Sequence, residues 1–299
     1  MSYKDTRRSD KFKRVDEHFR KTGKEKPKKN HNEEIIFNDY TKFLESKDKI
    51  GNIDITNHIK NMKTYTHYYK YPNKYYSDPV LENMPEYDKY VGDDTKIIFE
   101  KDYTINVAYK YKKDNPEKNV CILNFASAKN PGGGFLRGSM AQEESICYVS
   151  TLYHSLIQSD MYEINKKNPQ NGLYNDIGIY TNEICVFKLH RDDVEHIEPF
   201  YPSVISCPAI NKNYALEKGI SEDRIYDKIC DRIKLVFEIA KTHNVDILIL
   251  GAYGCGVFGN DSADIKEIFF GLIDNDYKNI FDQIVFAIPD DDKFDIFKQ

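Results

Sequence analysis

The sequence lacks the features that mark membrane-embedded and secreted proteins. Its longest apolar runs, such as ILIL and IVFAI, have the length of single strands and are far too short to cross a bilayer. The first 14 residues, MSYKDTRRSDKFKR, contain no apolar segment, so we expect no secretory signal and no contact with a membrane. Tryptophan is also absent, but its absence excludes no function.

Cysteine is scarce and scattered along the chain. Six cysteines occur in 299 residues, none forms a CxxC pair, and several stand inside apolar runs, where a free thiol behaves as a small core residue. This pattern disfavours zinc sites and disulfides and favours a reducing compartment. We therefore expect an intracellular protein, either cytoplasmic or nuclear. The six residues are Cys121, Cys147, Cys185, Cys207, Cys230 and Cys255.

Positive charge is concentrated at the N-terminus. Residues 1–30 hold 12 Lys and Arg against five Asp and Glu, whereas the whole chain has a net charge of −5. A basic arm therefore precedes an acidic body. Such an arm can attract nucleic acid or another polyanion. A solvated tail or a surface helix explains the same charges, and we prefer that interpretation.

Composition and pattern divide the chain into three segments. Hydrophobic residues make up 40% and charged residues 30%, which is typical of a soluble globular protein. We expect the basic arm over residues 1–30, a helical and tyrosine-rich extension packed on the core over 31–94, and the core over 95–299. The segment TYTHYYKYPNKYYSDP could stack on nucleic-acid bases or adenine. Tyrosines that cover an edge of the core are the interpretation we prefer.

Short apolar runs alternate with helical patterns from about residue 95. Helical spacing appears over residues 145–157, over 222–241 and in ADIKEIFFGLI. Strands that alternate with helices predict an α/β fold in which helices cover both faces of a mostly parallel sheet. The expected strands are TKIIFE, TINVAYKY, NVCILNF, CVFKL, SVISCPAI, VDILIL and QIVFAI.

Two of the expected strands lead into glycine-rich loops. NPGGGFLRGSM follows NVCILNF, and GAYGCGVFGND follows VDILIL. Ligands of open α/β sheets bind at the carboxyl ends of strands, and glycines let backbone N–H groups approach an anion closely. Two such loops suggest a diphosphate held between them. Neither loop fits a P-loop or the GxGxxG fingerprint, so a tight turn explains each loop taken singly.

A glutamine and two glutamates follow the first loop. Gln142, Glu143 and Glu144 stand at the expected start of a helix, where carboxylates are common because they suit the helix dipole. Beside a phosphate loop, a glutamate pair could also contact a sugar, and a glycosidase needs a carboxylic acid that protonates the leaving oxygen. The dipole lowers the pKa of such a glutamate, whereas a like-charged neighbour, a bound diphosphate and exclusion of water raise it.

These two motifs together resemble the microbial-type poly(ADP-ribose) glycohydrolases, which have the macrodomain fold. The resemblance rests on LNFASAKNPGGGFLRGSMAQEE and LGAYGCGVFGND, and it continues through SICYVSTLY, VISCPAIN and IVFAIPD. The GGG–x7–QEE element is specific to that family. The resemblance covers residues 95–290 well and the N-terminal third loosely. It implies a three-layer α/β/α macrodomain with a mixed, mostly parallel central sheet and an N-terminal helical extension.

The resemblance also implies roles for individual residues. Glu144 would be the general acid, and Glu143 and Asn130 would hold ribose hydroxyls beside it. Gln142 would belong to the same ligand site. The glycines of the first loop would lie beside the diphosphate and the distal ribose, and Phe258 would pack against that ribose. The two loops comprise Gly132, Gly133 and Gly134, and then Gly254, Cys255, Gly256, Val257 and Phe258.

The expected function is hydrolysis of the ribose–ribose O-glycosidic bonds of poly(ADP-ribose), which releases ADP-ribose. The expected partners are poly(ADP-ribose) and ADP-ribosylated proteins, and no cofactor or metal is expected. Three alternatives stay open: a reader that binds ADP-ribose without cutting it, a hydrolase that acts on another leaving group, and a nucleic-acid-binding protein led by the basic arm. The intact QEE element argues against the reader.

Overall fold

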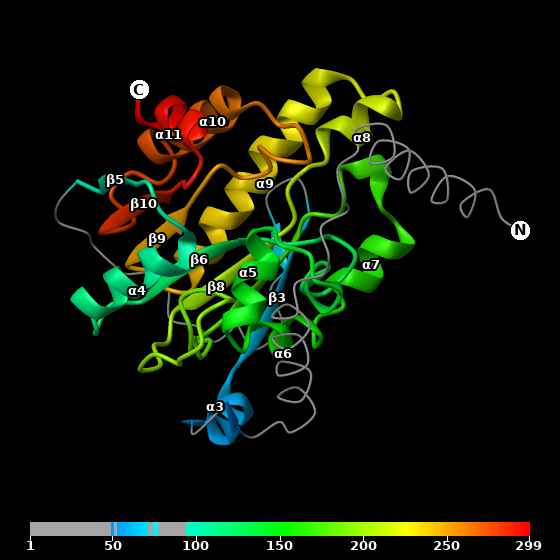
Figure 1. Ribbon diagram of the computed structural model, residues 1–299. Coiled ribbons are helices and arrows are strands. Elements are labelled where there is room, and N and C mark those ends of the chain that lie inside the picture. The colour runs from blue at the N-terminus through cyan, green and yellow to red at the C-terminus, as the bar shows by residue number, and fades with distance from the viewer. Residues whose placement is uncertain (1–48, 51–52, 71–73, 77–93) are drawn as a thin grey trace, which may run out of the picture.

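An eight-stranded mixed sheet forms the centre of the protein. The computed structural model describes residues 49–50, 53–70, 74–76 and 94–299 (Figure 1). The strand order of the sheet is β4-β3-β7-β8-β6-β9-β10-β5. Five neighbouring strands are parallel, and they are β8 (Ser203–Cys207), β6 (Val120–Phe125), β9 (Ile247–Leu250), β10 (Gln283–Ala287) and β5 (Lys96–Glu100). The basic arm lies outside the described residues.

The four inner parallel strands, β8, β6, β9 and β10, bury both of their faces, and most of their residues are apolar, whereas the edge strand β5 is only partly covered. In β6, Val120 and Ile122 face one helical layer, whereas Cys121 and Leu123 face the other. In β9, Ile247 and Ile249 alternate with Leu248 and Leu250 in the same way. Two hydrophobic cores therefore lie back to back across the sheet.

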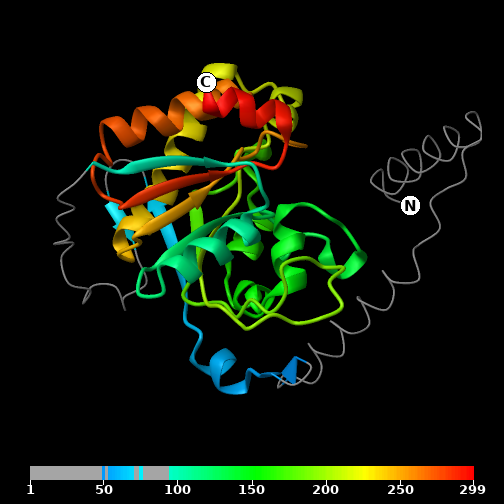
Figure 2. The same ribbon diagram turned by 60° about the vertical axis from the view of Figure 1, so that its left-hand side comes forward.

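Helices cover each face, as Figures 1 and 2 show. The prediction of a three-layer α/β/α fold with a mostly parallel sheet is therefore confirmed. The face of the sheet formed by Val120, Ile122, Ile247 and Ile249 packs against four helices. They are α4 (Thr104–Asp114), α5 (Gln142–Val149), which begins with Gln142, Glu143 and Glu144, α6 (Leu152–Leu156) and α7 (Met161–Lys167). The opposite face packs against α8 (Lys212–Glu217), α9 (Glu222–Thr242), α10 (Ser262–Asp274) and α11 (Asp291–Lys298).

The sheet continues past the parallel strands into the tyrosine-rich segment. β7 (Ile177–Thr181) pairs antiparallel with β8, and β3 (Thr64–Lys70) pairs antiparallel with β7 and with β4 (Lys74–Tyr76). The prediction of a helical extension over residues 31–94 is thus wrong for these two strands, and the sheet has no boundary at residue 95. Of that extension, α3 (Thr56–Asn61) is helical, β1 (Lys49–Ile50) and β2 (Ile53–Asp54) form a small hairpin, and residues 31–48 lie outside the described residues.

The alternation of side chains explains why β3 is a strand. Thr64 and Thr66 bond Ser155 and Ser159 on one face, whereas His67 on the other face bonds His243 at the end of α9. This period of two is the mark of a strand between two packed layers. Tyrosine density concealed the pattern in the sequence.

Two other expected strands are also corrected. TINVAYKY forms helix α4, because Ile105, Ala108 and Tyr111 repeat at helical spacing and are all buried. CVFKL forms only isolated bridges at Val186, with Ser150 and Phe200.

The expected helix over 145–157 is two helices, α5 and α6, separated at Ser150. Its hydroxyl donates to the carbonyl of Ile146 (2.7 Å), and its backbone is extended. In the described part of the chain, no helix is long and apolar enough to cross a membrane.

Candidate active site

Both glycine-rich loops lie at the same edge of the sheet. The first follows β6 and the second follows β9, and these strands are parallel neighbours. Their ends are in contact, because the ring of Phe125 packs edge-on against Tyr253 with the ring centroids 5.5 Å apart. The structure thus brings together two loops that are separated by more than a hundred residues in the sequence.

The first loop needs glycines because it packs directly on the glutamate pair. Gly132 and Gly133 have φ of +65° and +60°, a conformation that glycine adopts without strain. A Cβ on Gly133 would collide with Oε1 of Glu144 and would lie 3.1 Å from Oε2 of Glu143. A Cβ on Gly134 would collide with Ser139. The loop backbone therefore lies as close to both carboxyl groups as sterics allow.

Glu144 is held by backbone amides on both of its oxygens. Oε1 accepts from the N–H of Gly134 (2.8 Å), and Oε2 accepts from the N–H of Ala141 (3.0 Å). Glu144 is the third residue of α5, so the second bond also caps the start of that helix. The side chain is only 8% exposed. The carboxyl group of Glu144 is therefore held in one position between the first glycine loop and the start of α5.

Glu143 is more deeply buried than Glu144 and points back toward the sheet. Its Oε2 accepts from the N–H of Ser127 (2.7 Å), and Oε1 lies 3.5 Å from the amide nitrogen of Asn124. Burial is the main reason why the pKa of Glu143 is raised to about 8; the N–H of Ser127 opposes this shift, and the nearby Glu144 adds to it. The raised pKa favours the protonated form of Glu143 near neutral pH.

Gln142 joins helix α5 to the end of β6. Its Oε1 accepts from the N–H of Phe125 (2.8 Å), and its Nε2 donates to the carbonyl of Leu123 (2.7 Å) and lies 3.4 Å from Thr104 Oγ1. Its amide is occupied by these bonds, so the geometry gives Gln142 a positioning role beside the ligand site. These hydrogen bonds between α5 and β6 fix the positions of Glu143 and Glu144, which follow Gln142 in the helix.

Asn130 stands at the entrance of the first loop with an exposed side chain. Its carbonyl accepts from the N–H of Gly133 (2.9 Å), and its own N–H lies 3.2 Å from the hydroxyl of Ser127. The backbone of Asn130 thus shapes the turn, while its side-chain amide is available to a ligand.

The second loop is exposed to solvent, whereas the first loop packs against the two glutamates. Val257 is 91% exposed, and a Cβ on Gly256 would meet nothing within 4 Å. Within the described part of the chain, the N–H groups of Gly256, Val257 and Phe258 have no hydrogen-bond acceptor, which suits an anion. Burial raises the pKa of the Cys255 thiol to about 11, so that group is not a nucleophile at neutral pH.

Asparagines behind the second loop hold its shape, and sequence patterns missed them. Asn260 donates to the carbonyls of Ile210 (3.0 Å) and Gly254 (3.2 Å), and Asn213 donates to that of Val257 (3.3 Å). The only sequence signal is the position of Asn260 at the end of GVFGND. Ser127 and Asn124, which hold Glu143, flank the end of the strand NVCILNF and could have been inferred from that place.

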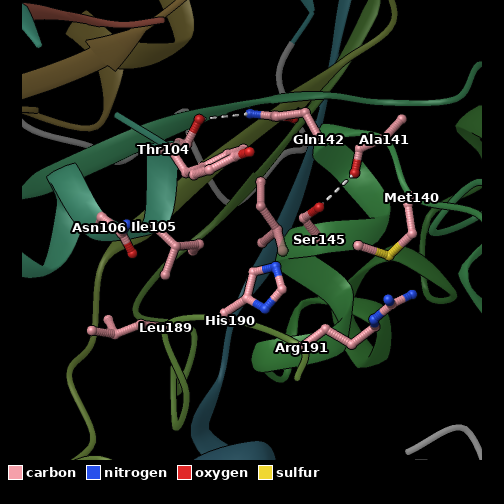
Figure 3. A pocket seen from close by; sticks show the side chains of 12 residues that line it. Thr104, Ile105, Asn106, Met140, Ala141, Gln142, Ser145, Leu189, His190 and Arg191 are labelled. Carbon is pink, nitrogen blue, oxygen red and sulfur yellow. Dashed lines mark hydrogen bonds between the residues drawn. The ribbon is translucent and has the colours of Figure 1, made fainter. Parts of the chain in front are cut away.

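A cavity of about 290 Å³ lies between the N-termini of α4 and α5, next to the glutamate helix (Figure 3). Thr104 and Gln142 bond across one side of it, and His190 and Arg191 border another. The sequence prediction missed this cavity because residues 104–111 were expected to form a strand.

Comparison with known proteins decides the family. The family model of the microbial-type PARG catalytic domain matches residues 34–189, slightly more than half of the chain. The protein belongs to this family of poly(ADP-ribose) glycohydrolases. No curated protein matched the chain.

Solved glycohydrolase structures are similar over most of the chain. The enzyme from Thermomonospora curvata is 28% identical, covers 90% of this chain and 99% of its own, and has a TM-score of 0.74. The same enzyme bound to the inhibitor ADP-HPD is 27% identical, with the same coverage and a TM-score of 0.70. The enzyme from Deinococcus radiodurans in complex with ADP-ribose is 30% identical, covers 68% of this chain and 84% of its own, and has a TM-score of 0.61.

Proposed function

We propose that the protein hydrolyses the ribose–ribose O-glycosidic bonds of poly(ADP-ribose), with Glu144 as the general acid and then the general base. The observation that carries the proposal is the contact between Gly133 and the two buried glutamates, at the edge where both glycine loops meet. A loop without side chains can pack directly on the two carboxyl groups and hold them at the edge where a sugar would bind. The family of the chain supports the same substrate.

Binding depends on backbone groups more than on charged side chains. The N–H groups of Gly256, Val257 and Phe258 are available to a diphosphate, and the open space at Gly256 lets its oxygens approach the backbone. Phe258 then packs against the distal ribose. Because backbone amides bind the anion, the negative net charge of the chain does not oppose binding.

The chemistry breaks the bond between C1″ of the terminal ribose and the 2′-oxygen of the next unit. Glu144 donates its proton to that oxygen while an oxocarbenium-like centre develops at C1″. The Glu144 carboxylate then takes a proton from the water that attacks C1″, so the residue returns to its starting form. The amides of Gly134 and Ala141 hold its two oxygens through both steps.

Glu143 positions the ribose. Because burial raises its pKa to about 8, its protonated form can donate a hydrogen bond to a ribose hydroxyl. Asn130 faces the same space with an exposed amide. The three residues would thus contact one sugar from α5 and from the first loop.

The test is incubation of the purified protein with poly(ADP-ribose) and analysis of the products. We expect release of ADP-ribose by the wild type. Binding of polymer without any release would identify a reader. Release of ADP-ribose only from modified side chains would identify a hydrolase with another leaving group.

We also propose an intracellular location and ADP-ribosylated proteins as partners, since polymer is carried on proteins. Nucleic-acid contact through residues 1–30 belongs to the same set of proposals. It would appear as DNA binding that weakens steeply with salt and is lost when residues 1–30 are removed.

A further inference from the structure

A turn that the sequence patterns did not single out forms one wall of the site. Residues 169–176 precede β7, which runs antiparallel to β8, so they lie at the carboxyl edge of the parallel strands. This is the edge that carries both glycine loops. The backbone of the turn has left-handed φ at Gln170 (45°), Asn171 (56°) and Tyr174 (57°). Non-glycine residues adopt this conformation when the surrounding structure holds them in place.

A fully buried arginine holds this turn in place. Arg232 of α9 donates to the carbonyl of Leu173 (3.0 Å) and pairs with the carboxylate of Asp176 (3.0 Å). It also donates to the carbonyl of Pro208, just beyond β8. One guanidinium therefore fixes the turn to the end of the neighbouring strand.

The turn places Tyr174 between the two glycine loops. The ammonium of Lys129, the residue before Asn130, lies 6.0 Å from the centroid of the Tyr174 ring. The ring of Phe258 lies on the second loop with its centroid 6.5 Å from that of Tyr174. Among the described residues, no carboxylate forms an ion pair with Lys129. The charge of Lys129 at the mouth of the site is thus not neutralised by any carboxylate of the described residues.

A second contact between a lysine and a tyrosine ring lies farther from the glycine loops. The ring of Tyr214 lies behind the turn, where a Cβ on Gly172 would touch it, and is 38% exposed. The ammonium of Lys218 lies 5.0 Å above that ring. We call Lys129, Tyr174, Tyr214 and Lys218 the Lys–Tyr row. In this row, a lysine lies at each end and two tyrosine rings lie between them, with Tyr174 buried and Tyr214 exposed.

We infer that the Lys–Tyr row binds the leaving unit of the polymer, which is the second ADP-ribose from the chain end. The inference rests on the proposed function. Phe258 is assigned to the distal ribose, and the row begins directly beyond Phe258, where the group on the far side of the cleaved bond must lie. That group carries an adenine, which can stack on the exposed ring of Tyr214, and a diphosphate, which attracts the ammonium groups of Lys129 and Lys218. Free ADP-ribose occupies the loops but has no second unit for the row.

The test compares substrates that differ only in their leaving group. One is poly(ADP-ribose), and the other is ADP-ribose joined through C1″ to a small uncharged alcohol. We expect Lys129→Gln to lower kcat/KM for the polymer about tenfold, the effect of one charged contact. Its kcat/KM for the small substrate and its Kd for free ADP-ribose should equal those of the wild type. Lys218→Gln should show the same selectivity with a smaller effect.

The control is Lys118→Gln, which also removes one positive charge but lies before β6, at the opposite edge of the sheet, where the ammonium pairs with Asp282 (2.8 Å). It should leave all three values unchanged. The inference is overturned if Lys129→Gln changes nothing, because Lys129 would then only cover Tyr174. It is also overturned if the mutation weakens ADP-ribose binding or slows both substrates equally, because Lys129 would then contact the terminal unit. A wild type that leaves the polymer uncut contradicts the proposed function instead.

Discussion

The two glycine-rich loops contain similar residues but use glycine for opposite reasons. In the first loop, glycines let the backbone pack against other parts of the same protein, since a Cβ on Gly133 would strike Glu144. In the second loop, Gly256 faces open space, so its lack of a side chain serves a ligand. Under the proposed function, the first loop therefore shapes the catalytic groups and the second binds the anion. Substitutions of single glycines can separate these two uses.

The largest effect is expected for Gly133→Ala. The added methyl group must displace the Glu144 carboxyl, and alanine also resists the positive φ at this position. Turnover of polymer should fall by roughly a thousandfold, within the range that acid–base catalysis supplies. The control is Gly138→Ala, which also has positive φ (80°) but would meet nothing within 4 Å. Equal loss of turnover in both variants would show that strain, and not contact with Glu144, is the cause.

Substitutions of Gly256 should change binding and leave the fold intact. Gly256→Glu places bulk and negative charge where the diphosphate lies, so ADP-ribose should no longer raise Tm. Gly256→Ala should keep the Tm of the unliganded wild type, because the added Cβ has room. Thermal unfolding with and without ADP-ribose measures both effects. A lowered Tm of unliganded Gly256→Ala would remove the contrast between the loops.

Asn130→Ala should have a smaller effect on both binding and turnover. The side chain is exposed and its backbone shapes the loop, so the fold should survive. Loss of one hydrogen bond to ribose should raise the Kd of ADP-ribose about tenfold. Calorimetric titration measures this change. An unchanged Kd would exclude the Asn130 amide from the ribose site.

The last expected effect is a dependence of stability on pH, which bears on Glu143 and not on the glycine loops. The folded-state pKa of Glu143 is raised to about 8, above its ordinary value, so the folded protein binds more protons than the unfolded chain between those two values. Folding stability from this residue therefore decreases as pH rises from about 4.5 to 8. Glu143→Gln removes the titration, and its Tm should fall less than that of the wild type over this range. Parallel curves for both proteins would contradict the raised pKa.

The sequence was sufficient to predict the place of the loops, because consecutive strand–loop–helix units of a parallel sheet bring their loops to one edge. The signal for the glutamates was equally local, at the start of α5. The groups that hold them could not be predicted, since the bond from Ser127 to Glu143 depends on how β6 and α5 pack. The anchoring of the 169–176 turn by Arg232 spans 59 residues and leaves no sequence pattern.

The errors in the predicted fold came from ambiguous patterns. TINVAYKY has the β-branched and aromatic residues of a strand, yet its buried residues follow helical spacing in α4. In β3, side chains alternate between the two faces of the sheet, but the sequence has tyrosines at positions for both faces, so it shows no apolar–polar alternation. The contacts of Thr64 with α6 and of His67 with the end of α9 identify the two faces. In both segments, tertiary packing decided between two local structures that the sequence allowed.

Glu144→Gln is the most direct test of the catalytic assignment. Glutamine keeps the size of the side chain, and its one amide oxygen can accept from the N–H of either Gly134 or Ala141, but it cannot donate the proton that the leaving oxygen needs. The measurement is the rate of ADP-ribose release from poly(ADP-ribose), with the Kd of ADP-ribose determined on the same sample. We predict that the rate falls by about 10²–10⁴-fold while the Kd stays close to that of the wild type. Release at the wild-type rate would contradict the account and would leave Glu144 as only the cap of a helix.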